Sequence, residues 1–290
     1  AGVPALGFIS NHQYSIAEDM VVFPNAKVNI GLSVTGKRPD GFHNLETVFY
    51  PIGLSDMLEI GPGEGKTGEY VFKNTGIDVQ CEPENNLIVK AYRLLSDIYH
   101  LPAVRIHLHK IIPFGAGLGG GSADAAFMLK ALDTYFELHI SRQELTRLAA
   151  GLGSDCAFFI ANRPAFARGK GEILEEIELD LQEYRFVLLK PLTGVSTPEA
   201  YAGISPQPAN FDLRQLPAIS VNEWKERIYN DFEKTVFKKY PAIGSLKQKL
   251  YDAGALYASM TGSGSAVYGI FERNGAIHLD CPDIFVWQDK

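Results

Sequence analysis

The residues with the clearest chemical potential form a glycine-rich stretch at positions 113–126, with the sequence PFGAGLGGGSADAA. Its five glycines permit positive φ angles and let the backbone approach a ligand closely, because no Cβ intervenes. Consecutive backbone N–H groups can then converge on a single anion. The stretch therefore predicts a loop that binds phosphate groups.

The residues that follow the loop predict a helix that begins at the same place, with Ser122 as its N-cap. An apolar stripe at helical spacing supports this prediction. Its members are Ala125, Met128, Leu129, Leu132, Tyr135 and Phe136. The unpaired N–H groups and the positive end of the helix dipole would then face the bound anion. The loop lacks the Lys-Ser/Thr ending of a Walker loop and the spacing of a dinucleotide fingerprint, so it indicates a kinase of another class.

A lysine and an asparagine share one face of an expected strand near the start of the chain. Residues 28–34 alternate between apolar and polar side chains, which is the period of a half-buried strand. Lys27 and Asn29 fall on the polar face. A solvent-exposed lysine is the ordinary alternative for Lys27, and the pattern alone leaves both interpretations open.

An acidic residue, Asp155, stands between an expected helix and the apolar segment 156–161. Ser141 and Glu144 have the spacing of a capping box that would open this helix, and Gly151 and Gly153 are expected to end it. A carboxylate at such a junction is either a helix cap or a catalytic acid or base. Both roles remain open at this point.

Two ring-bearing residues, Phe42 and His43, follow a tight turn predicted over residues 37–41. Aromatic side chains at turns often bind planar ligands. The alternative places Phe42 in the core and His43 on the surface. A second hydroxyl-bearing loop occupies residues 260–266, where a plain hairpin turn is an equally good explanation.

The remaining pattern mixes strands and helices without internal repeats. Asn85 or Asn86 is expected to cap an amphipathic helix, and a glycine- and charge-rich hairpin tip is expected over residues 61–68. The polar His107 and His109 are better explained as a solvated strand face than as metal ligands, since no carboxylate or thiol stands beside them. Strands are expected at 47–51, 57–60, 104–109, 186–190 and 267–271, helices at 222–239 and 243–253, and an irregular connection at 204–216.

Composition limits the class of protein. The chain has 290 residues, 46% of them hydrophobic, which is enough for a large core and for two domains. A formal net charge of −7 and the lack of basic runs argue against nucleic acid. Three scattered cysteines favour a reducing, cytoplasmic setting. No apolar run is long enough for a membrane span, and residues 1–19 are expected to be an expression remnant or an upstream extension.

Three separated segments together resemble the galactokinase, homoserine kinase, mevalonate kinase and phosphomevalonate kinase (GHMP) superfamily. They are PNAKVN at 24–29, the glycine-rich stretch at 113–126 and TGSG at 261–264. Within the superfamily the chain is similar to the 4-diphosphocytidyl-2-C-methyl-D-erythritol kinases of the non-mevalonate isoprenoid route. The segments that carry this likeness are TGKRPDGFH at 35–43, residues 84–89 and 117–122, LGSD at 152–155 and AFARGKGE at 165–172.

The resemblance implies an α+β fold of two domains, with helices packed on mixed sheets and the active site in the cleft between the domains. Residues 20–172 would form the ATP-binding domain and residues 173–290 the domain that completes the substrate site. It also implies ATP-dependent phosphorylation of a 2-hydroxyl group on a cytidine diphosphate substrate. Asp155 falls where the family has its catalytic base, and Lys27 falls where it has the paired lysine.

The resemblance further implies the binding residues. ATP would be bound by Asn86, Lys110, Pro113, Gly115, Gly117, Gly119, Gly120, Gly121 and Ser122. The substrate would be bound by Asn29, Phe42, His43, Thr197, Tyr201, Gly262 and Gly264. Mg²⁺ would arrive with the nucleotide, and Asp124 is a candidate ligand only by proximity. The alternatives are a sister kinase acting on homoserine, mevalonate or a sugar, and a catalytically silent nucleotide-binding member of the fold.

Overall fold

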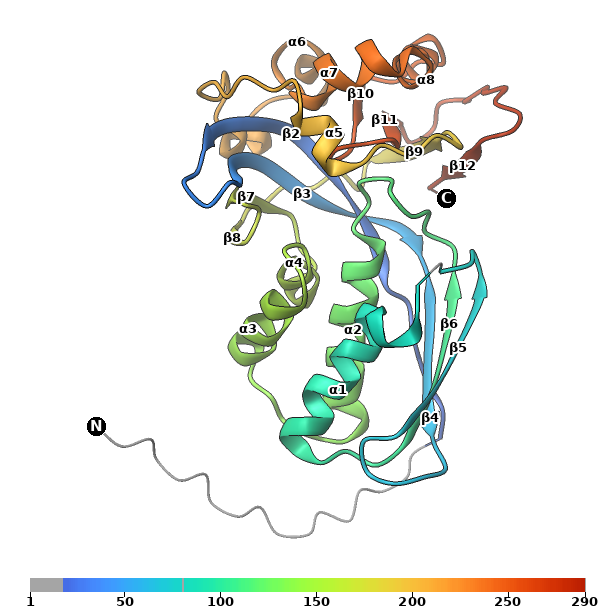
Figure 1. Ribbon diagram of the computed structural model, residues 1–290. Helices are drawn as coiled ribbons and strands as arrows, with labels where there is room; N and C mark the ends of the chain where they lie inside the picture. Colours follow the sequence, from blue (N-terminus) through green and yellow to red (C-terminus); the bar gives the residue numbers. More distant parts are fainter. Residues whose placement is uncertain (1–17, 80, 290) are drawn as a thin grey trace.

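The computed structural model describes residues 18–79 and 81–289 and has three four-stranded sheets in this part of the chain (Figure 1). The expectation for residues 1–19 therefore falls almost wholly outside the described residues. No helix among those described is both long enough and apolar enough to cross a membrane. The mixture of helices and sheets confirms the predicted α+β class. The predicted domain limits stay a prediction.

The first sheet and four helices form one layered unit. The sheet has the order β1 (Met20–Val22), β4 (Met57–Pro62), β6 (Val104–Lys110), β5 (Tyr70–Gly76). The helices lie together to one side of this sheet (Figure 1). They are α1 (Leu87–Tyr99), α2 (Gly120–Tyr135), α3 (Arg142–Leu152) and α4 (Cys156–Ala161). The alternating Val104, Ile106 and Leu108 of β6 are buried in the core between sheet and helices, as their spacing predicts.

The second sheet carries the longest strands and connects the two halves of the chain. Its order is β2 (Asn25–Lys37), β3 (His43–Ser55), β7 (Ala165–Gly169), β8 (Ile173–Glu176). Strands β2 and β3 extend from the helical unit to the C-terminal half (Figure 1). There Val28 and Ile30 pack in one core with Phe186 and Leu188 of the third sheet. Residues of β2 are therefore placed between the two halves.

The third sheet and the remaining helices form the C-terminal half. The sheet has the order β10 (Tyr257–Met260), β11 (Val267–Glu272), β9 (Tyr184–Lys190), β12 (Phe285–Gln288), with every pairing antiparallel. The helices of this half are α5 (Thr197–Tyr201), α6 (Trp224–Arg227), α7 (Phe232–Lys239) and α8 (Pro241–Asp252). Helices α7 and α8 pack on the sheet through a core that includes Val236, Leu250 and Val267.

Several sequence predictions about local structure are confirmed. Asn86 caps α1 by accepting the N–H of Ile88 at 2.9 Å. Ser141 caps α3 by accepting the N–H of Glu144; the Glu144 carboxylate, however, pairs with Arg147. The expected turn before Phe42 is closed by the N–H of Arg38, which donates to the carbonyl of Phe42 at 2.8 Å.

Three local predictions were wrong, and each was overridden by a contact distant in sequence or by a glycine. Residues 61–68 do not close a hairpin, because β5 pairs in parallel with β6 instead of with β4. The expected helix at 222–239 is broken around Asn230, whose neighbours form backbone hydrogen bonds to Leu32 of β2. The predicted end of α3 is partly confirmed, because the helix includes Gly151 but ends at Leu152, with Gly153 as its C-cap. The N-cap of α2 is Gly119, with φ +70°, and Ser122 lies inside the first turn.

Candidate active site

The glycine-rich loop connects β6 to α2 and borders a cavity of about 410 Å³. Gly115, Gly117 and Gly119 all have positive φ, at +59°, +74° and +70°. These angles suit glycine because other residues clash with their own backbone there. Helix α2 then starts at Gly120, so its free N–H groups are available to a ligand at this end. The loop thus leads directly into the helix, as the sequence predicts.

A second loop from the C-terminal half packs directly on the first. The N–H groups of Ser265 and Ala266 donate to the carbonyls of Gly115 and Ala116 at 3.3 and 3.4 Å. A Cβ on Gly117 would lie 2.1 Å from the carbonyl oxygen of Thr261. Gly117 is therefore required both by its backbone angle and by the close approach of the other half.

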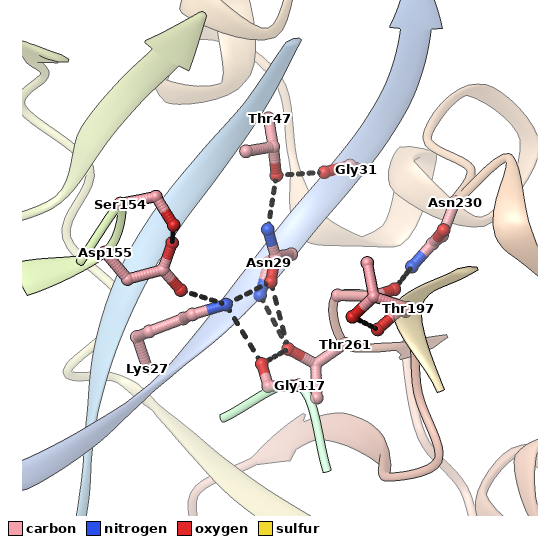
Figure 2. A network of polar contacts seen from close by, with 12 residues as sticks. Lys27, Asn29, Gly31, Thr47, Gly117, Ser154, Asp155, Thr197, Asn230 and Thr261 are labelled. Atoms are coloured by element: carbon pink, nitrogen blue, oxygen red, sulfur yellow. Dashed lines mark hydrogen bonds and ion pairs between the residues drawn. The ribbon is translucent and has the colours of Figure 1, made fainter. Parts of the chain in front are cut away.

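Lys27 and Asp155 meet at the edge of this loop (Figure 2). The Lys27 ammonium lies 3.5 Å from Oδ2 of Asp155. It also donates hydrogen bonds to Oδ1 of Asn29 at 2.7 Å and to the carbonyl of Gly117 at 2.9 Å. Lys27 is 3% exposed and Asn29 is likewise buried, so this face of β2 is enclosed and the half-buried pattern predicted for the strand was wrong here.

Burial lowers the pKa of the Lys27 ammonium, and the negative charge of Asp155 opposes that shift. The ammonium is further stabilised by its two oxygen acceptors and by the Phe49 ring, whose centroid is 4.9 Å from Nζ. Removing the carboxylate would leave a desolvated cation without its counter-charge. The two side chains are therefore electrostatically dependent on each other.

Asp155 occupies the N-cap position of α4 but makes no side-chain cap hydrogen bond. Its carboxylate instead faces Lys27 and accepts a hydrogen bond of 3.4 Å from the hydroxyl of Ser154. The side chain is 26% exposed and lines the cavity, whereas that of Lys27 is 4% exposed. The geometry therefore supports the chemical alternative over the capping one. A cavity-lining carboxylate beside a buried cation can accept a proton from a bound hydroxyl group.

A buried hydrogen-bond network joins the two halves behind this pair (Figure 2). The Asn29 N–H donates to the Thr261 hydroxyl at 3.1 Å, and that hydroxyl lies 3.2 Å from Oδ1 of Asn29 and 3.0 Å from the Gly117 carbonyl. The Asn29 side-chain amide donates to the Thr47 hydroxyl at 3.0 Å. Asn29 is thereby held by β3 on one side and by the C-terminal half on the other.

Ring-bearing side chains gather where the hairpin of the first half meets α5. His43 and Tyr201 are stacked, with centroids 4.7 Å apart and planes 20° from parallel, and Tyr201 packs edge-on against Phe232. Phe42 is 57% exposed, so the alternative that places it in the core is wrong. Tyr201 lines the cavity, whereas the cavity wall includes neither Phe42 nor His43.

Lys110 and Asp124 form a buried ion cluster with Asp56 beneath the glycine loop. Lys110 pairs with Asp56 and, at 2.8 Å, with Asp124, and Asp56 also accepts the N–H groups of Ile111 and Ile112. Burial raises the pKa of Asp124 to about 7; Lys110 opposes the shift and the charge of Asp56 adds to it. Asp124 is thus occupied with Lys110 and does not line the cavity.

The structure brings most of the expected site residues to one cavity. Its wall includes Lys27, Asn29, Lys110, Pro113, Gly115, Gly117, Gly119, Gly120, Gly121, Ser122, Asp155, Thr197, Tyr201, Gly262 and Gly264. The wall does not include Asn86, whose side chain caps α1, but it includes the next residue, Leu87. Sequence reasoning missed the linking role of Thr261 and the cavity position of Lys170. Both lie in segments that carried the resemblance, so the signal was present but was not assigned.

Comparison with known proteins agrees with this geometry. Residues 86–169 match the model of the GHMP kinases N terminal domain, and residues 213–278 match that of the GHMP kinases C terminal domain. The 4-diphosphocytidyl-2-C-methyl-D-erythritol kinase of Bacteroides thetaiotaomicron is 52% identical over 89% of this chain and 94% of the relative. The protein of that name from Bacteroides fragilis strain YCH46 is 52% identical over 93% of this chain and 99% of its own length.

Solved structures extend the likeness. A crystal structure of 4-(cytidine 5'-diphospho)-2C-methyl-D-erythritol kinase is 33% identical, with a TM-score of 0.73 over 87% of this chain and 90% of the other. The Methanococcus jannaschii mevalonate kinase has a TM-score of 0.67 at 14% identity, over 96% of this chain and 98% of the other, which shows a shared fold alone. The sequence and structural likenesses together show that this chain belongs to the 4-diphosphocytidyl-2-C-methyl-D-erythritol kinase family of the GHMP kinases.

Proposed function

We propose that this chain phosphorylates the 2-hydroxyl group of 4-diphosphocytidyl-2-C-methyl-D-erythritol with ATP as the phosphoryl donor. The observation that carries the proposal is the Lys27–Asp155 pair, 3.5 Å apart at the edge of a glycine-rich loop that opens a helix. The names of the relatives that are 52% identical over nearly the whole chain support the choice of substrate.

In the proposed reaction, Asp155 accepts the proton of the substrate hydroxyl as its oxygen attacks the γ-phosphorus of ATP. The new oxygen–phosphorus bond forms while the bond to the β-phosphate oxygen breaks, and ADP leaves. The Lys27 ammonium holds the Asp155 carboxylate in place through their ion pair and offsets negative charge that develops nearby. The N–H groups of the glycine loop and of α2 hold the phosphates in line, since phosphoryl transfer depends mainly on position and electrostatics.

Mg²⁺ would be carried with the nucleotide and would neutralise phosphate charge. Among the described residues, no group of three or more His, Cys, Asp or Glu side chains is arranged to hold a metal ion. Mg²⁺ commonly binds through phosphates, waters and one or two protein oxygens. Ser122 and Asp155 bear side-chain oxygens in the cavity wall beside the glycine loop, so the site fits an ion brought by ATP. Asp124 does not fit that role, because it is buried against Lys110.

A coupled assay of ADP release tests the proposal. We expect ADP release with 4-diphosphocytidyl-2-C-methyl-D-erythritol and none with homoserine, mevalonate or galactose. Cytidine diphosphate should compete with the substrate at saturating ATP, whereas mevalonate should not. Turnover of mevalonate or homoserine instead would assign a sister kinase, and ATP binding without ADP release on any substrate would assign a silent nucleotide-binding protein.

A further inference from the structure

One lysine of the cavity wall has no role in the site described so far. Lys170 lies in the turn between β7 and β8, where Gly169 and Gly171 have φ +73° and +107°. The turn is closed by two hydrogen bonds. The N–H of Gly171 donates to the backbone carbonyl of Arg168, and the N–H of Lys170 donates to the Glu172 carboxylate. The backbone of Lys170 is therefore held by the turn, and Lys170 is one of the residues that line the cavity.

Lys170 differs from the other lysines of the cavity wall in its charge partners. Lys27 is paired with Asp155, and Lys110 is paired with Asp56 and Asp124. The Lys170 ammonium has no carboxylate oxygen of a described residue within 4.0 Å. Lys170 is exposed, so its charge is hydrated and available to an anion. Among the described residues of the cavity wall, Lys170 is thus the lysine without a carboxylate in contact with its ammonium group.

The ammonium of Lys170 lies over the Phe42 ring, 4.8 Å from its centroid. A cation at this distance is attracted to the ring face, so the long side chain is drawn toward the hairpin that carries Phe42 and His43. Asp40, in the turn of that hairpin, is near enough to Lys170 for their charges to interact, but it is paired with Arg38 at 3.2 Å and accepts the N–H of Phe42 at 3.1 Å. Lys170 thus lies beside the aromatic group and also reaches the wall that holds Asp155.

We propose that Lys170 binds the diphosphate group of the substrate. The inference rests on the proposed function. If the substrate hydroxyl is held at Asp155 and the cytosine at the aromatic side chains near Phe42, the diphosphate that joins these ends must cross the wall between them. Lys170 contacts Phe42 and lines the same cavity as Asp155. An ammonium group binds a phosphate oxygen through a charge-assisted hydrogen bond, and this contact does not require a metal ion.

Separating the base from its phosphates provides the test. Cytidine and cytidine diphosphate share the base and ribose, and they differ in the group that Lys170 is proposed to bind. We would measure the inhibition constant of each against the substrate at saturating ATP, for the wild type, Lys170→Met and Lys170→Arg. Met keeps most of the side-chain length without the charge, and Arg restores a cation. Lys238→Met is the matched control, because Lys238 is exposed on α7 outside the cavity wall.

In Lys170→Met we expect the inhibition constant of cytidine diphosphate and the KM of the substrate to rise about five- to tenfold, in the range of a partly exposed charge pair. The inhibition constant of cytidine and the KM for ATP should change less than about twofold. Lys170→Arg should recover most of the loss, and high salt should weaken diphosphate binding in the wild type more than in Lys170→Met.

Two results would overturn the proposal. Unchanged binding of cytidine diphosphate in Lys170→Met would exclude a contact with the diphosphate. An equal loss for cytidine and cytidine diphosphate would mean that Lys170 acts through the Phe42 ring alone. Failure of the proposed function would look different, because the wild type would then neither phosphorylate the cytidine substrate nor bind cytidine diphosphate in competition with it.

Discussion

The Lys27 ammonium lies 3.5 Å from Oδ2 of Asp155 although the two residues come from different elements, strand β2 and the start of α4. The charge of each side chain is balanced by that of the other. The Lys27 ammonium is buried, and the Asp155 carboxylate is its counter-charge. Asp155 stands at the N-cap position of α4, but its carboxylate makes no capping hydrogen bond. This relationship is hard to explain by packing, since burying the Lys27 charge costs desolvation energy.

Replacing Asp155 by Asn should therefore slow turnover strongly while leaving ATP bound. The amide has nearly the same shape but cannot accept the hydroxyl proton, and general-base catalysis is worth about 10²- to 10⁴-fold in rate. The measurement is kcat by ADP release together with the Kd of ATP by calorimetry. Lys27→Met should likewise lower kcat and leave the Kd of ATP nearly unchanged. Full turnover in Asp155→Asn would remove the assigned base.

Exchanging Gly117 for Ala should impair the site much more than the same change at Gly115. Both residues have positive φ, so each Ala carries a backbone strain of about 1–2 kcal/mol. At Gly117 the new Cβ would also meet the Thr261 carbonyl at 2.1 Å, whereas nothing lies within 4 Å of the same atom at Gly115. The Kd of ATP and kcat of both variants, measured in parallel, provide the check. Equal defects would mean that the contact between the two loops is unimportant.

The sequence predicts which residues form this site better than it predicts how deeply they are buried. The glycine spacing at 113–126 predicts the loop, and the alternation in β2 puts Lys27 and Asn29 on one face, because both signals are local. The burial of that face was not predictable, since it is covered by Thr261 and Tyr268 from more than 230 positions away in the chain. Alternation along a strand predicts that its apolar face is buried. It does not show whether another part of the chain also covers the polar face.

The same physical limit explains the other failed predictions. The glycine- and charge-rich segment at 61–68 does contain a turn, but only the parallel pairing of Tyr70 with Val104 determines where the next strand goes. Asn230 interrupts a helical pattern because its side chain donates to the carbonyls of Met260 and Gly262. Ser122 is a good capping residue, yet Gly119 begins the helix one turn earlier by adopting a left-handed conformation.

Thr261→Val should destabilise the fold and slow the reaction together. Valine keeps the shape but removes the hydroxyl that receives the buried Asn29 N–H and contacts the Gly117 carbonyl. An unsatisfied buried donor costs about 1–3 kcal/mol. We expect a loss of that size in the free energy of unfolding, measured by urea denaturation, and a lower kcat because Asn29 helps to hold Lys27. Thr261→Ser is the control, since it keeps the hydroxyl and should retain most of both properties.

The buried carboxyl group of Asp124 should make stability depend on pH. Burial raises its pKa from 3.8 to about 7; Lys110 opposes the shift and Asp56 adds to it. Between these two values the folded protein holds a proton that the unfolded chain has released, so more protons are bound in the folded state. Stability from this group is then fully present below about pH 4 and is lost as pH rises through about 7.

Asp124→Asn removes the titration at nearly constant shape and isolates this effect. We expect the wild type to lose unfolding free energy relative to Asp124→Asn between pH 4.5 and pH 8, as measured by urea denaturation at each pH. Asp97→Asn, at an exposed position on α1, should show no such difference. If the wild type and Asp124→Asn had the same pH profile, Asp124 would have to be ionised across the whole range. Lys110 would then outweigh burial, and the cluster beneath the glycine loop would carry a net negative charge.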